Sequence, residues 1–156
     1  MGVTCEAGDP APPFDLQIDA EKRVSLKDFL GKKLALYFYP KDDTSGCTAE
    51  AIAFNALRRE FDKAGTAILG VSPDSVKSHA KFKAKHRLDL ELAADEDKAI
   101  LEAYGVWVEK SMYGRKYMGV ERSTFLIDGD GRIVQAWRKV KVAGHAEAVL
   151  AAAQKL

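Results

Sequence analysis

Short apolar runs separated by polar or glycine-containing turns make up most of this chain. The runs "LALYFY" (34–39) and "TAILGVS" (66–72) are almost continuously apolar and too short for core helices, which predicts two buried strands. Between them, apolar residues recur at helical spacing, which predicts a helix over 48–63. Because the two strands are joined through a helix, we expect them to be parallel with a right-handed crossover.

Shorter patterns on either side of this unit predict further strands and helices. Alternating apolar positions in "FDLQI" and "RVSL" predict an N-terminal β-hairpin, followed by a helical turn in "SLKDFLGKK". The segments "STFLID" (123–128) and "RIVQAWRK" (132–139) predict an antiparallel hairpin around the turn "DGDG". The other expected elements are a polar helix over 74–86 with Asp74 as its cap, a short strand in "LDLELAAD", a helix over 98–105 and a closing helix from about His145.

This order of elements predicts an α/β fold, with a central mixed β-sheet flanked by helices and an N-terminal β-hairpin. The 156 residues fit one domain over residues 1–156. A composition of 47% hydrophobic and 30% charged residues is typical of a soluble globular protein. The net charge of +1, without a basic stripe, argues against nucleic acid as a partner. No apolar run is long enough for a membrane span or a secretory leader, so we expect a cytoplasmic protein without membrane contact.

Cys47 follows Gly46 where the first buried strand gives way to the helix, in "YPKDDTSGCTAEAIAF" (39–54). Gly46 leaves the backbone open to a small ligand, and Thr44 is near enough to direct its hydroxyl towards the sulfur. A free thiol has a pKa of about 8.5, and lowering it to about 6 takes roughly 3.4 kcal/mol. A helix N-terminus supplies about 0.3 to 1 kcal/mol, and at most about 2. A reactive thiol here needs a cation from elsewhere in the fold, and without one Cys47 is an inert buried residue.

Arg122, which begins the strand sequence "RSTFLID", is our candidate for this cation. Arginine is always charged, and its planar fork can reach a sulfur and an oxygen ligand together. Spacing alone does not separate Arg122 from Arg115, Lys116 and Arg138. A solvated arginine at the end of a strand is an equally good interpretation of the pattern by itself.

The spacing Pro40-x-x-x-Thr44-x-x-Cys47 resembles the active-site signature of the peroxiredoxins. The segments "YFYPKDDTSGCTAEA", "GVSPDS", "ERSTFLID" and "WRKVKVAGHAEAVL" resemble the Q-type subgroup, also called bacterioferritin comigratory proteins. The similarity covers nearly the whole chain from Gly8. It implies a thioredoxin-like fold and a thiol-dependent peroxidase that reduces hydrogen peroxide and organic hydroperoxides to water or an alcohol, without a bound cofactor.

The same resemblance implies a role for each residue of the site. Cys47 is expected to be the peroxidatic nucleophile, which becomes a sulfenic acid, and Thr44 to hydrogen-bond the peroxide. Pro40 is expected to shield the sulfenic acid, and Arg122 matches the active-site arginine of the family. Glu50 matches a position that orients this arginine, although a carboxylate in the first turn of a helix also interacts favourably with the helix dipole. Backbone N–H groups at the start of the helix are expected to stabilise charge on the peroxide oxygens.

The chain departs from the Q-type pattern at its resolving cysteine. Many members carry a second cysteine five residues after the first, where this chain has Ile52, or on the following helix, which has none here. Ser45 also replaces the usual proline before the glycine. Cys5 is the one other thiol and a candidate resolving residue, but we favour a one-cysteine cycle. An external thiol, from thioredoxin or glutathione with glutaredoxin, is then expected to reduce the sulfenic acid through a mixed disulfide. We expect a monomer.

Other kinds of function remain as alternatives. A peroxide sensor or redox-relay module would oxidise at Cys47 and pass the oxidation to a partner protein as a mixed disulfide. A non-catalytic thioredoxin-like domain would carry an unreactive Cys47. The three histidines, His79, His86 and His145, have no cysteine or carboxylate at ligand spacing, so we predict no metal site.

Overall fold

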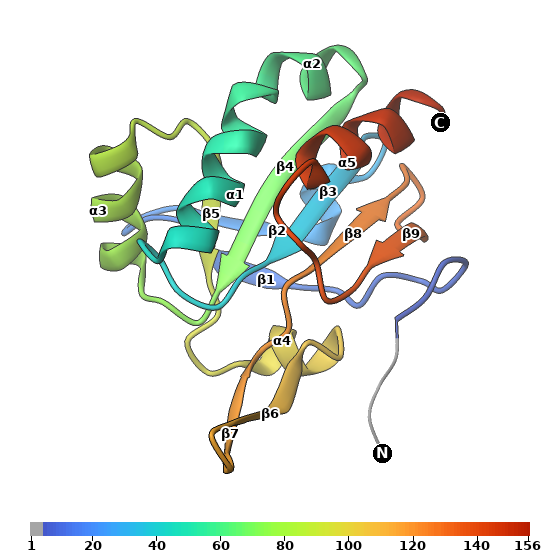
Figure 1. Ribbon diagram of the computed structural model, residues 1–156. Helices are drawn as coiled ribbons and strands as arrows, with labels where there is room; N and C mark the ends of the chain where they lie inside the picture. Colours follow the sequence, from blue (N-terminus) through green and yellow to red (C-terminus); the bar gives the residue numbers. More distant parts are fainter. Residues whose placement is uncertain (1–4) are drawn as a thin grey trace.

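The computed structural model describes residues 5–156, and its centre is a mixed β-sheet (Figure 1). The strands of this sheet are β1 (Asp15–Gln17), β2 (Arg23–Ser25), β3 (Lys33–Phe38), β4 (Thr66–Ser72), β5 (Glu91–Ala94), β8 (Ser123–Ile127) and β9 (Ile133–Trp137). Within the described residues they lie in the order β2-β1-β5-β4-β3-β8-β9. The sequence therefore predicted the central strands and both hairpins correctly, and the hairpin β1–β2 extends the main sheet through β5.

Strand β3 lies between β4 and β8, and its two neighbours run in opposite directions. It pairs in parallel with β4, as expected for strands joined through a helical crossover. It pairs antiparallel with β8 in a register that places Phe38 opposite Ser123. The end of β3 and the start of β8 therefore meet at the same edge of the sheet, which is where the first helix begins.

Helices cover both faces of the sheet. The helical elements are η1 (Leu26–Phe29), α1 (Ser45–Ala56), α2 (Arg58–Lys63), α3 (Val76–His86), α4 (Ala99–Ala103) and α5 (His145–Gln154). One apolar cluster joins Ala35 and Tyr37 of β3 to residues of α1, α2, α3 and α5. The other joins Leu34 and Leu36 to α4 and to the N-terminal segment. Alternate residues of β3 thus enter two separate cores, as the pleat of a strand requires.

The predicted helices over 48–63 and 74–86 differ in their ends from the helices of the structure. The predicted helix over 48–63 is two helices, because the backbone turns at Leu57 (φ −95°, ψ 5°). Its first residue is Ser45 rather than Thr48, so Cys47 lies inside the first turn. The cap of α3 is Ser75, whose side chain accepts a hydrogen bond from the Ser78 amide, whereas Asp74 bonds elsewhere.

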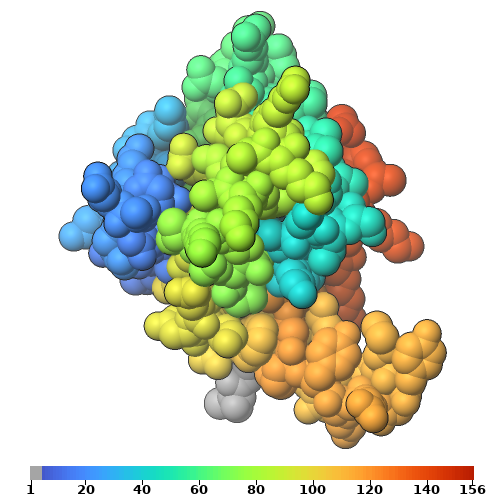
Figure 2. Space-filling model, turned by 90° about the vertical axis from the view of Figure 1, so that its left-hand side faces the viewer, coloured from blue at the N-terminus to red at the C-terminus, as the bar shows by residue number. Residues whose placement is uncertain are grey.

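A two-stranded sheet, formed by β6 (Trp107–Met112) and β7 (Arg115–Val120), was not predicted from the sequence. It projects from the body of the molecule, as Figures 1 and 2 show. Its strands pair with each other from Trp107–Val120 to Met112–Arg115, and most of its side chains are at least partly exposed. No large apolar face marks it in the sequence. Among residues 5–156, no helix combines the length and apolar character that a bilayer span needs.

Candidate active site

Cys47 lies in the first turn of α1, directly after the loop that leaves β3. Thr44 is the N-cap residue in an extended conformation, and its carbonyl accepts the first helical hydrogen bond, from the Thr48 amide at 2.8 Å. The amide groups of the first turn therefore have no helical partner and carry the positive end of the helix dipole. The Cys47 side chain is almost fully buried, with 1% of the residue exposed.

The guanidinium of Arg122, a residue that directly precedes β8, contacts the Cys47 sulfur. Its Nη2 donates a hydrogen bond to Cys47 Sγ at 3.3 Å, and its Nη1 donates to Glu50 Oε1 at 2.7 Å. The residue lies between β7 and β8, immediately before Ser123, which pairs with the last residue of β3. Sheet register, rather than proximity in sequence, therefore places this arginine beside the cysteine.

The other cations considered for this role lie elsewhere. Arg115 and Lys116 are exposed on β7, and Lys116 Nζ pairs with Glu109 at 3.7 Å. Arg138 donates to the backbone carbonyls of Cys5, Tyr104 and Gly105. Of the four candidates, Arg122 is the one for which the described residues show a contact with Cys47.

Glu50 is buried under the guanidinium, one helical turn after Cys47. It is 1% exposed, and its Oε2 has no hydrogen-bond partner among the described residues. Burial raises the pKa of Glu50 to about 7, although the charge and hydrogen bond of Arg122 act in the opposite direction. Burial lowers the pKa of Arg122, but Glu50 and Cys47 outweigh it, so the pKa lies above its ordinary value.

Gly46, Pro40 and Thr44 lie in the chain segment between β3 and the first turn of α1. A Cβ atom on Gly46 would lie 3.2 Å from Nη2 of Arg122, so the absence of a side chain leaves room for the guanidinium. Pro40 follows β3 and is half-buried. Thr44 is exposed, and its hydroxyl donates to the Lys41 carbonyl at 2.9 Å. The hydroxyl thus closes a turn in the loop and keeps its lone pairs free.

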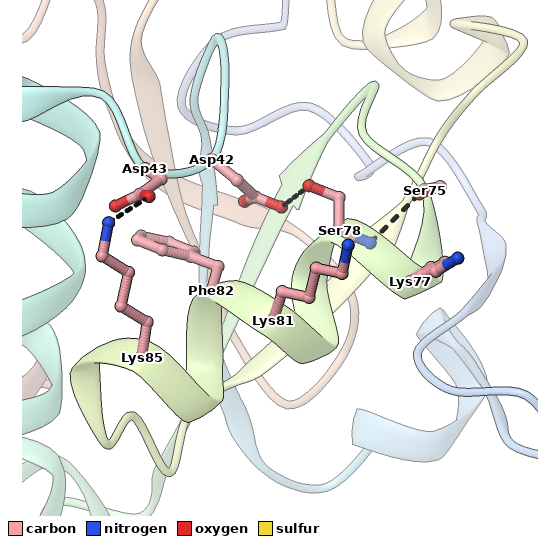
Figure 3. Close-up of a pocket in the computed structure, with 8 residues that line it drawn as sticks. All are labelled: Asp42, Asp43, Ser75, Lys77, Ser78, Lys81, Phe82 and Lys85. Carbon is pink, nitrogen blue, oxygen red and sulfur yellow. Dashed lines mark hydrogen bonds and ion pairs between the residues drawn. The ribbon is translucent and has the colours of Figure 1, made fainter.

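Two surface hollows lie near this region. One, of about 470 Å³, is lined by Val108, Glu109, Lys110, Glu121, Arg122, Lys139 and Val140. A larger one, of about 540 Å³, lies along α3 and is lined partly by Asp42, Asp43 and Lys85 (Figure 3). The smaller hollow is lined by Arg122, and Cys47 is not among its lining residues. The larger hollow contains none of the site residues predicted from the sequence.

Cys5 lies on the opposite face of the sheet from Cys47. Its side chain packs in the cluster with Leu34 and Leu36, whereas Cys47 belongs to the cluster with Ala35 and Tyr37. The Cys5 thiol donates to the Ala103 carbonyl at 3.5 Å. Burial raises the pKa of Cys5, more than the positive charge of Arg138 lowers it. The structure therefore does not bring the two cysteines together.

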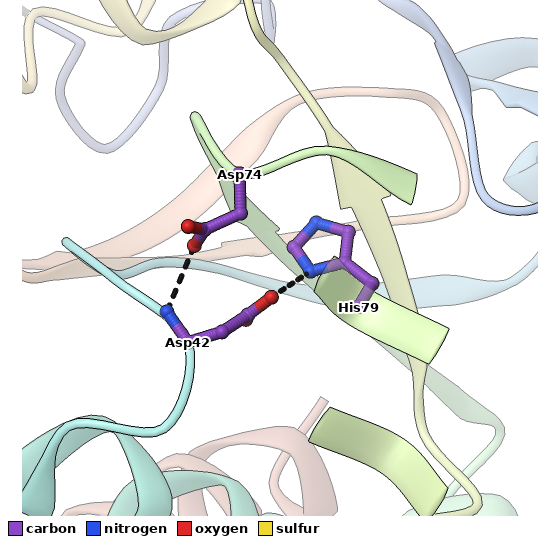
Figure 4. A group of neighbouring side chains, drawn as sticks. All are labelled: Asp42, Asp74 and His79. Atoms are coloured by element: carbon purple, nitrogen blue, oxygen red, sulfur yellow. Dashed lines mark hydrogen bonds and ion pairs between the residues drawn. The ribbon is translucent and has the colours of Figure 1, made fainter. Parts of the chain in front are cut away.

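Sequence reasoning missed a buried polar network beside the loop that leads to Cys47. Asp42, Asp74 and His79 converge there, as Figure 4 shows. Both ring nitrogens of His79 are occupied, Nδ1 by Asp42 Oδ2 at 2.7 Å and Nε2 by the Ala93 carbonyl at 2.9 Å. Asp42, Asp74 and His79 are therefore connected by hydrogen bonds to one another and to the backbone. The sequence signal was the pair of carboxylates in "PKDDT", which follows a buried strand directly.

Comparison with known sequences identifies a family for this chain. The sequence model of the AhpC/TSA family matches residues 7–136. Peroxiredoxin Bcp of Xanthomonas campestris is 55% identical over 145 residues, which cover 92% of this chain and 91% of that protein. Peroxiredoxin Bcp of Bacillus subtilis is 48% identical over 143 residues, which cover 92% of this chain and 91% of that protein.

Solved structures agree with this relationship and confirm the predicted thioredoxin-like fold. Xanthomonas campestris peroxiredoxin Q has a TM-score of 0.88 at 50% identity, with 99% of this chain and 97% of that chain covered. The bacterioferritin comigratory protein of Xanthomonas campestris, which has alkyl peroxide reduction activity, has a TM-score of 0.90 at 49% identity, with the same coverage. The chain thus belongs to the AhpC/TSA family and, within it, to the Bcp or Q-type peroxiredoxins, which are thiol peroxidases.

Proposed function

We propose that this peroxidase reduces hydrogen peroxide and organic hydroperoxides at Cys47, in a one-cysteine cycle completed by an external thiol. The observation that carries the proposal is the guanidinium of Arg122, which contacts both Cys47 Sγ and Glu50 at the first turn of a helix. A cation and free amide groups at one sulfur favour its thiolate form, the form that attacks peroxides.

In the first half of the cycle, the Cys47 thiolate attacks the terminal oxygen of the hydroperoxide. A sulfur–oxygen bond forms as the oxygen–oxygen bond breaks, giving a sulfenic acid, and the departing oxygen takes up a proton to leave as water or an alcohol. Arg122 and the amide groups of the first turn stabilise the charge that develops on the oxygens. Pro40 shields the sulfur, and Thr44 hydrogen-bonds the peroxide after its hydroxyl turns from the Lys41 carbonyl.

In the second half, a thiol of the reductant attacks the sulfenic sulfur, and water leaves as a mixed disulfide forms. A second thiol then attacks this disulfide and releases Cys47 in its reduced form. An internal disulfide is disfavoured because Cys5 lies in the other core and Ile52 occupies the alternative position. The family relationship points to a thioredoxin-type reductant, and glutathione with glutaredoxin is the second candidate. We propose a cytoplasmic monomer, with Cys5 outside the cycle.

The decisive experiment follows peroxide consumption with thioredoxin, thioredoxin reductase and NADPH. We expect Cys47→Ser to abolish turnover and Cys5→Ser to retain most of it. Arg122→Met is expected to slow the oxidation of Cys47, whereas the matched change Arg115→Met, at an exposed arginine of β7, is expected to leave it unchanged. Equal effects of the two cysteine changes, or of the two arginine changes, would contradict the assigned roles.

Two further measurements separate this cycle from its alternatives. Mass spectrometry after one equivalent of peroxide is expected to show a single sulfenic acid, trapped by dimedone, rather than a bridge between Cys5 and Cys47. Sustained turnover with catalytic amounts of protein supports the enzyme. A single stoichiometric oxidation that no reductant reverses would support the sensor instead.

A further inference from the structure

The loop from Pro40 to Thr44, which leads from β3 into α1, is held on one side by α3. Asp42 in this loop is 8% exposed and reaches into the junction between the loop and the helix. Its neighbour Asp43 accepts a hydrogen bond from Lys85 Nζ at 2.7 Å (Figure 3) and another from His86 Nε2 at 2.8 Å. Two consecutive carboxylates of the loop thus form hydrogen bonds with α3, the buried Asp42 with Ser78 and His79, and the exposed Asp43 with Lys85 and His86.

Asp42 forms hydrogen bonds with residues from three parts of the fold. Tyr39, which directly follows β3, donates a hydrogen bond from its hydroxyl to Oδ1 at 2.6 Å. Ser78 of α3 donates to Oδ2 at 2.8 Å (Figure 3), and His79 Nδ1 lies 2.7 Å from the same oxygen (Figure 4). The Asp42 amide donates to Asp74 Oδ2 at 2.8 Å, in the connection between β4 and α3. The hydrogen bonds of Asp42 therefore connect the loop to the end of β3, to α3 and to the connection between β4 and α3.

The partners of His79 determine its protonation state. A backbone carbonyl can only accept a hydrogen bond, so the Nε2 atom that faces Ala93 carries a proton. At 2.7 Å, Nδ1 and the Asp42 carboxylate must also share a proton, since two acceptors at that distance repel each other. Burial raises the pKa of Asp42, but the hydrogen bonds from His79 and Tyr39 outweigh it and leave the pKa below its usual value.

The contacts of His79, which is 1% exposed, fit an imidazolium paired with the Asp42 carboxylate. The titratable groups that face it are Asp42, Asp74 and Tyr39, whose hydroxyl lies 3.3 Å from Nδ1. A buried charge of this kind is costly unless it is paired and fully hydrogen-bonded, and this one meets both conditions. Because breaking such a pair leaves an uncompensated charge, the loop and α3 are held to one arrangement.

This arrangement fixes the part of the loop that contacts the substrate in the proposed cycle. The turn from Lys41 to Thr44 contains Asp42, and Thr44 closes it with a hydrogen bond of 2.9 Å. Asp43 adopts a left-handed backbone conformation (φ 61°), which aspartate accepts more readily than most residues, and its hydrogen bonds to Lys85 and His86 hold it in place. Thr44 then caps the helix that carries Cys47.

We propose that His79, acting as an imidazolium through Asp42, is a positioning residue for peroxide reduction. It fixes the turn from Lys41 to Thr44 and so holds Pro40 and Thr44 at the approach to Cys47. The proposal rests on the proposed function, because it assigns these two residues to the peroxide. Loss of the pair is expected to slow the reaction with peroxide more than any reaction that needs the Cys47 thiolate alone.

The first test reads the protonation state directly in the wild-type protein. Nitrogen-15 NMR of the histidine side chains at neutral pH is expected to show both ring nitrogens of His79 protonated, with the resonances assigned by their loss in His79→Gln. Asp42→Asn, which keeps the shape but removes the negative charge, is expected to abolish this signature. A neutral ring at position 79 in the wild-type protein overturns the proposal without reference to activity.

The second test compares two reactions of Cys47. In His79→Gln and Asp42→Asn, the rate constant for oxidation by hydrogen peroxide is expected to fall roughly ten- to a hundredfold, as for other small misplacements of a reacting group. Alkylation by iodoacetamide, which needs no peroxide contacts, is expected to change less than about twofold. Lys81→Gln, an exposed change on the same helix, is the matched control and is expected to alter neither rate.

A double-mutant cycle with Thr44→Val identifies the route of the effect. If His79 acts by holding Thr44, the loss caused by His79→Gln is expected to be much smaller when Thr44 is already replaced. Equal losses in both backgrounds, or equal losses in both reactions of Cys47, overturn the positioning role. A wild-type protein that consumes no peroxide would overturn the proposed function and this inference with it, whereas an active wild type with a fully active His79→Gln overturns the inference alone.

Discussion

Replacement of Glu50 by glutamine is expected to change how the stability of the protein depends on pH. Glu50 Oε1 accepts a hydrogen bond from Arg122, and Oε2 has no partner among the described residues. Glutamine has the same shape, retains an acceptor for Arg122 and places its amide nitrogen where Oε2 lies. The substitution therefore removes an ionisable group from the site while largely preserving its packing.

The size of the effect follows from the burial of the carboxyl. Burial raises the pKa of Glu50 from 4.5 to about 7 in the folded protein. The folded state then binds this proton more tightly than the unfolded state, so the stabilisation is complete below about pH 4.5 and lost as pH rises through about 7. At about 1.36 kcal/mol per pH unit, the wild-type protein loses about 3 kcal/mol through this one group.

Urea unfolding of the reduced proteins between about pH 4.5 and pH 8 measures this difference. The free energy of unfolding of Glu50→Gln, minus that of the wild type, is expected to rise by about 3 kcal/mol across the range. Asp95, whose pKa burial raises to about 6, titrates in the same window, but it is present in both proteins and cancels in the difference. Arg122→Lys, which keeps both a positive charge and the ionisable carboxyl of Glu50, is the control for a change at this site that removes no ionisable carboxyl.

A difference that stays constant with pH would refute the reasoning. It would mean that the ion pair with Arg122 keeps Glu50 ionised throughout, so that the attraction at 2.7 Å exceeds the cost of burial. The guanidinium would then face the sulfur with its charge already neutralised. The expected result instead gives Arg122 an uncompensated positive charge below about pH 7, where Glu50 is protonated.

Three further predictions test the packing around the site. Gly46→Ala places a methyl group 3.2 Å from Arg122 Nη2 and is expected to displace the guanidinium, so that stopped-flow oxidation of Cys47 slows while the circular dichroism spectrum is retained. Ile52→Cys places a thiol at a residue that is 47% exposed, and mass spectrometry after peroxide treatment is expected to show loss of two hydrogens as Cys47 and the new cysteine pair, which requires α1 to unwind locally. Gly70→Ala brings a methyl group within 2.7 Å of the Tyr37 ring, so urea unfolding is expected to show a loss of roughly 1 to 3 kcal/mol, and an unchanged midpoint would contradict the packing described.

The sequence predicted the central part of the fold well because its signals are local. Continuous apolar runs gave β3 and β4 to within a residue at each end, and the hairpin of β8 and β9 has turn residues between two apolar segments. The hairpin of β6 and β7 was not predicted because, within residues 5–156, its strands pair only with each other, and they lack a continuous apolar face. The break between α1 and α2 at Leu57 was not predicted, because no glycine or proline lies next to it in the sequence.

The candidate site divides in the same way. Cys47, Thr44 and Pro40 form a local motif, so their position at the strand-to-helix junction was predictable from the sequence. The choice of Arg122 as the cation depended on the family resemblance, because the sequence pattern fitted Arg115 equally well. The pairing of β3 with β8, which the sequence pattern does not reveal, distinguishes the two arginines. The network of Asp42 and His79 was not found, since it depends on the packing of α3 against a loop that is far away in sequence.

The loop that carries the chemistry lies between two neighbours, Arg122 on one side and His79 of α3 on the other. On one side, Arg122 meets the first turn of α1, and its place depends on the register of β8 against β3, in which a slip of one residue would turn the neighbouring side chains to the other face. On the other side, Asp42 anchors the loop to an imidazolium on α3. Neither contact involves a second cysteine, and Cys5 lies beyond the sheet. A bridge between Cys5 and Cys47 would require both cores to open, whereas reduction by an external thiol requires only that the 1% exposed Cys47 becomes accessible at the start of α1, which is the physical reason to expect a one-cysteine cycle in this chain.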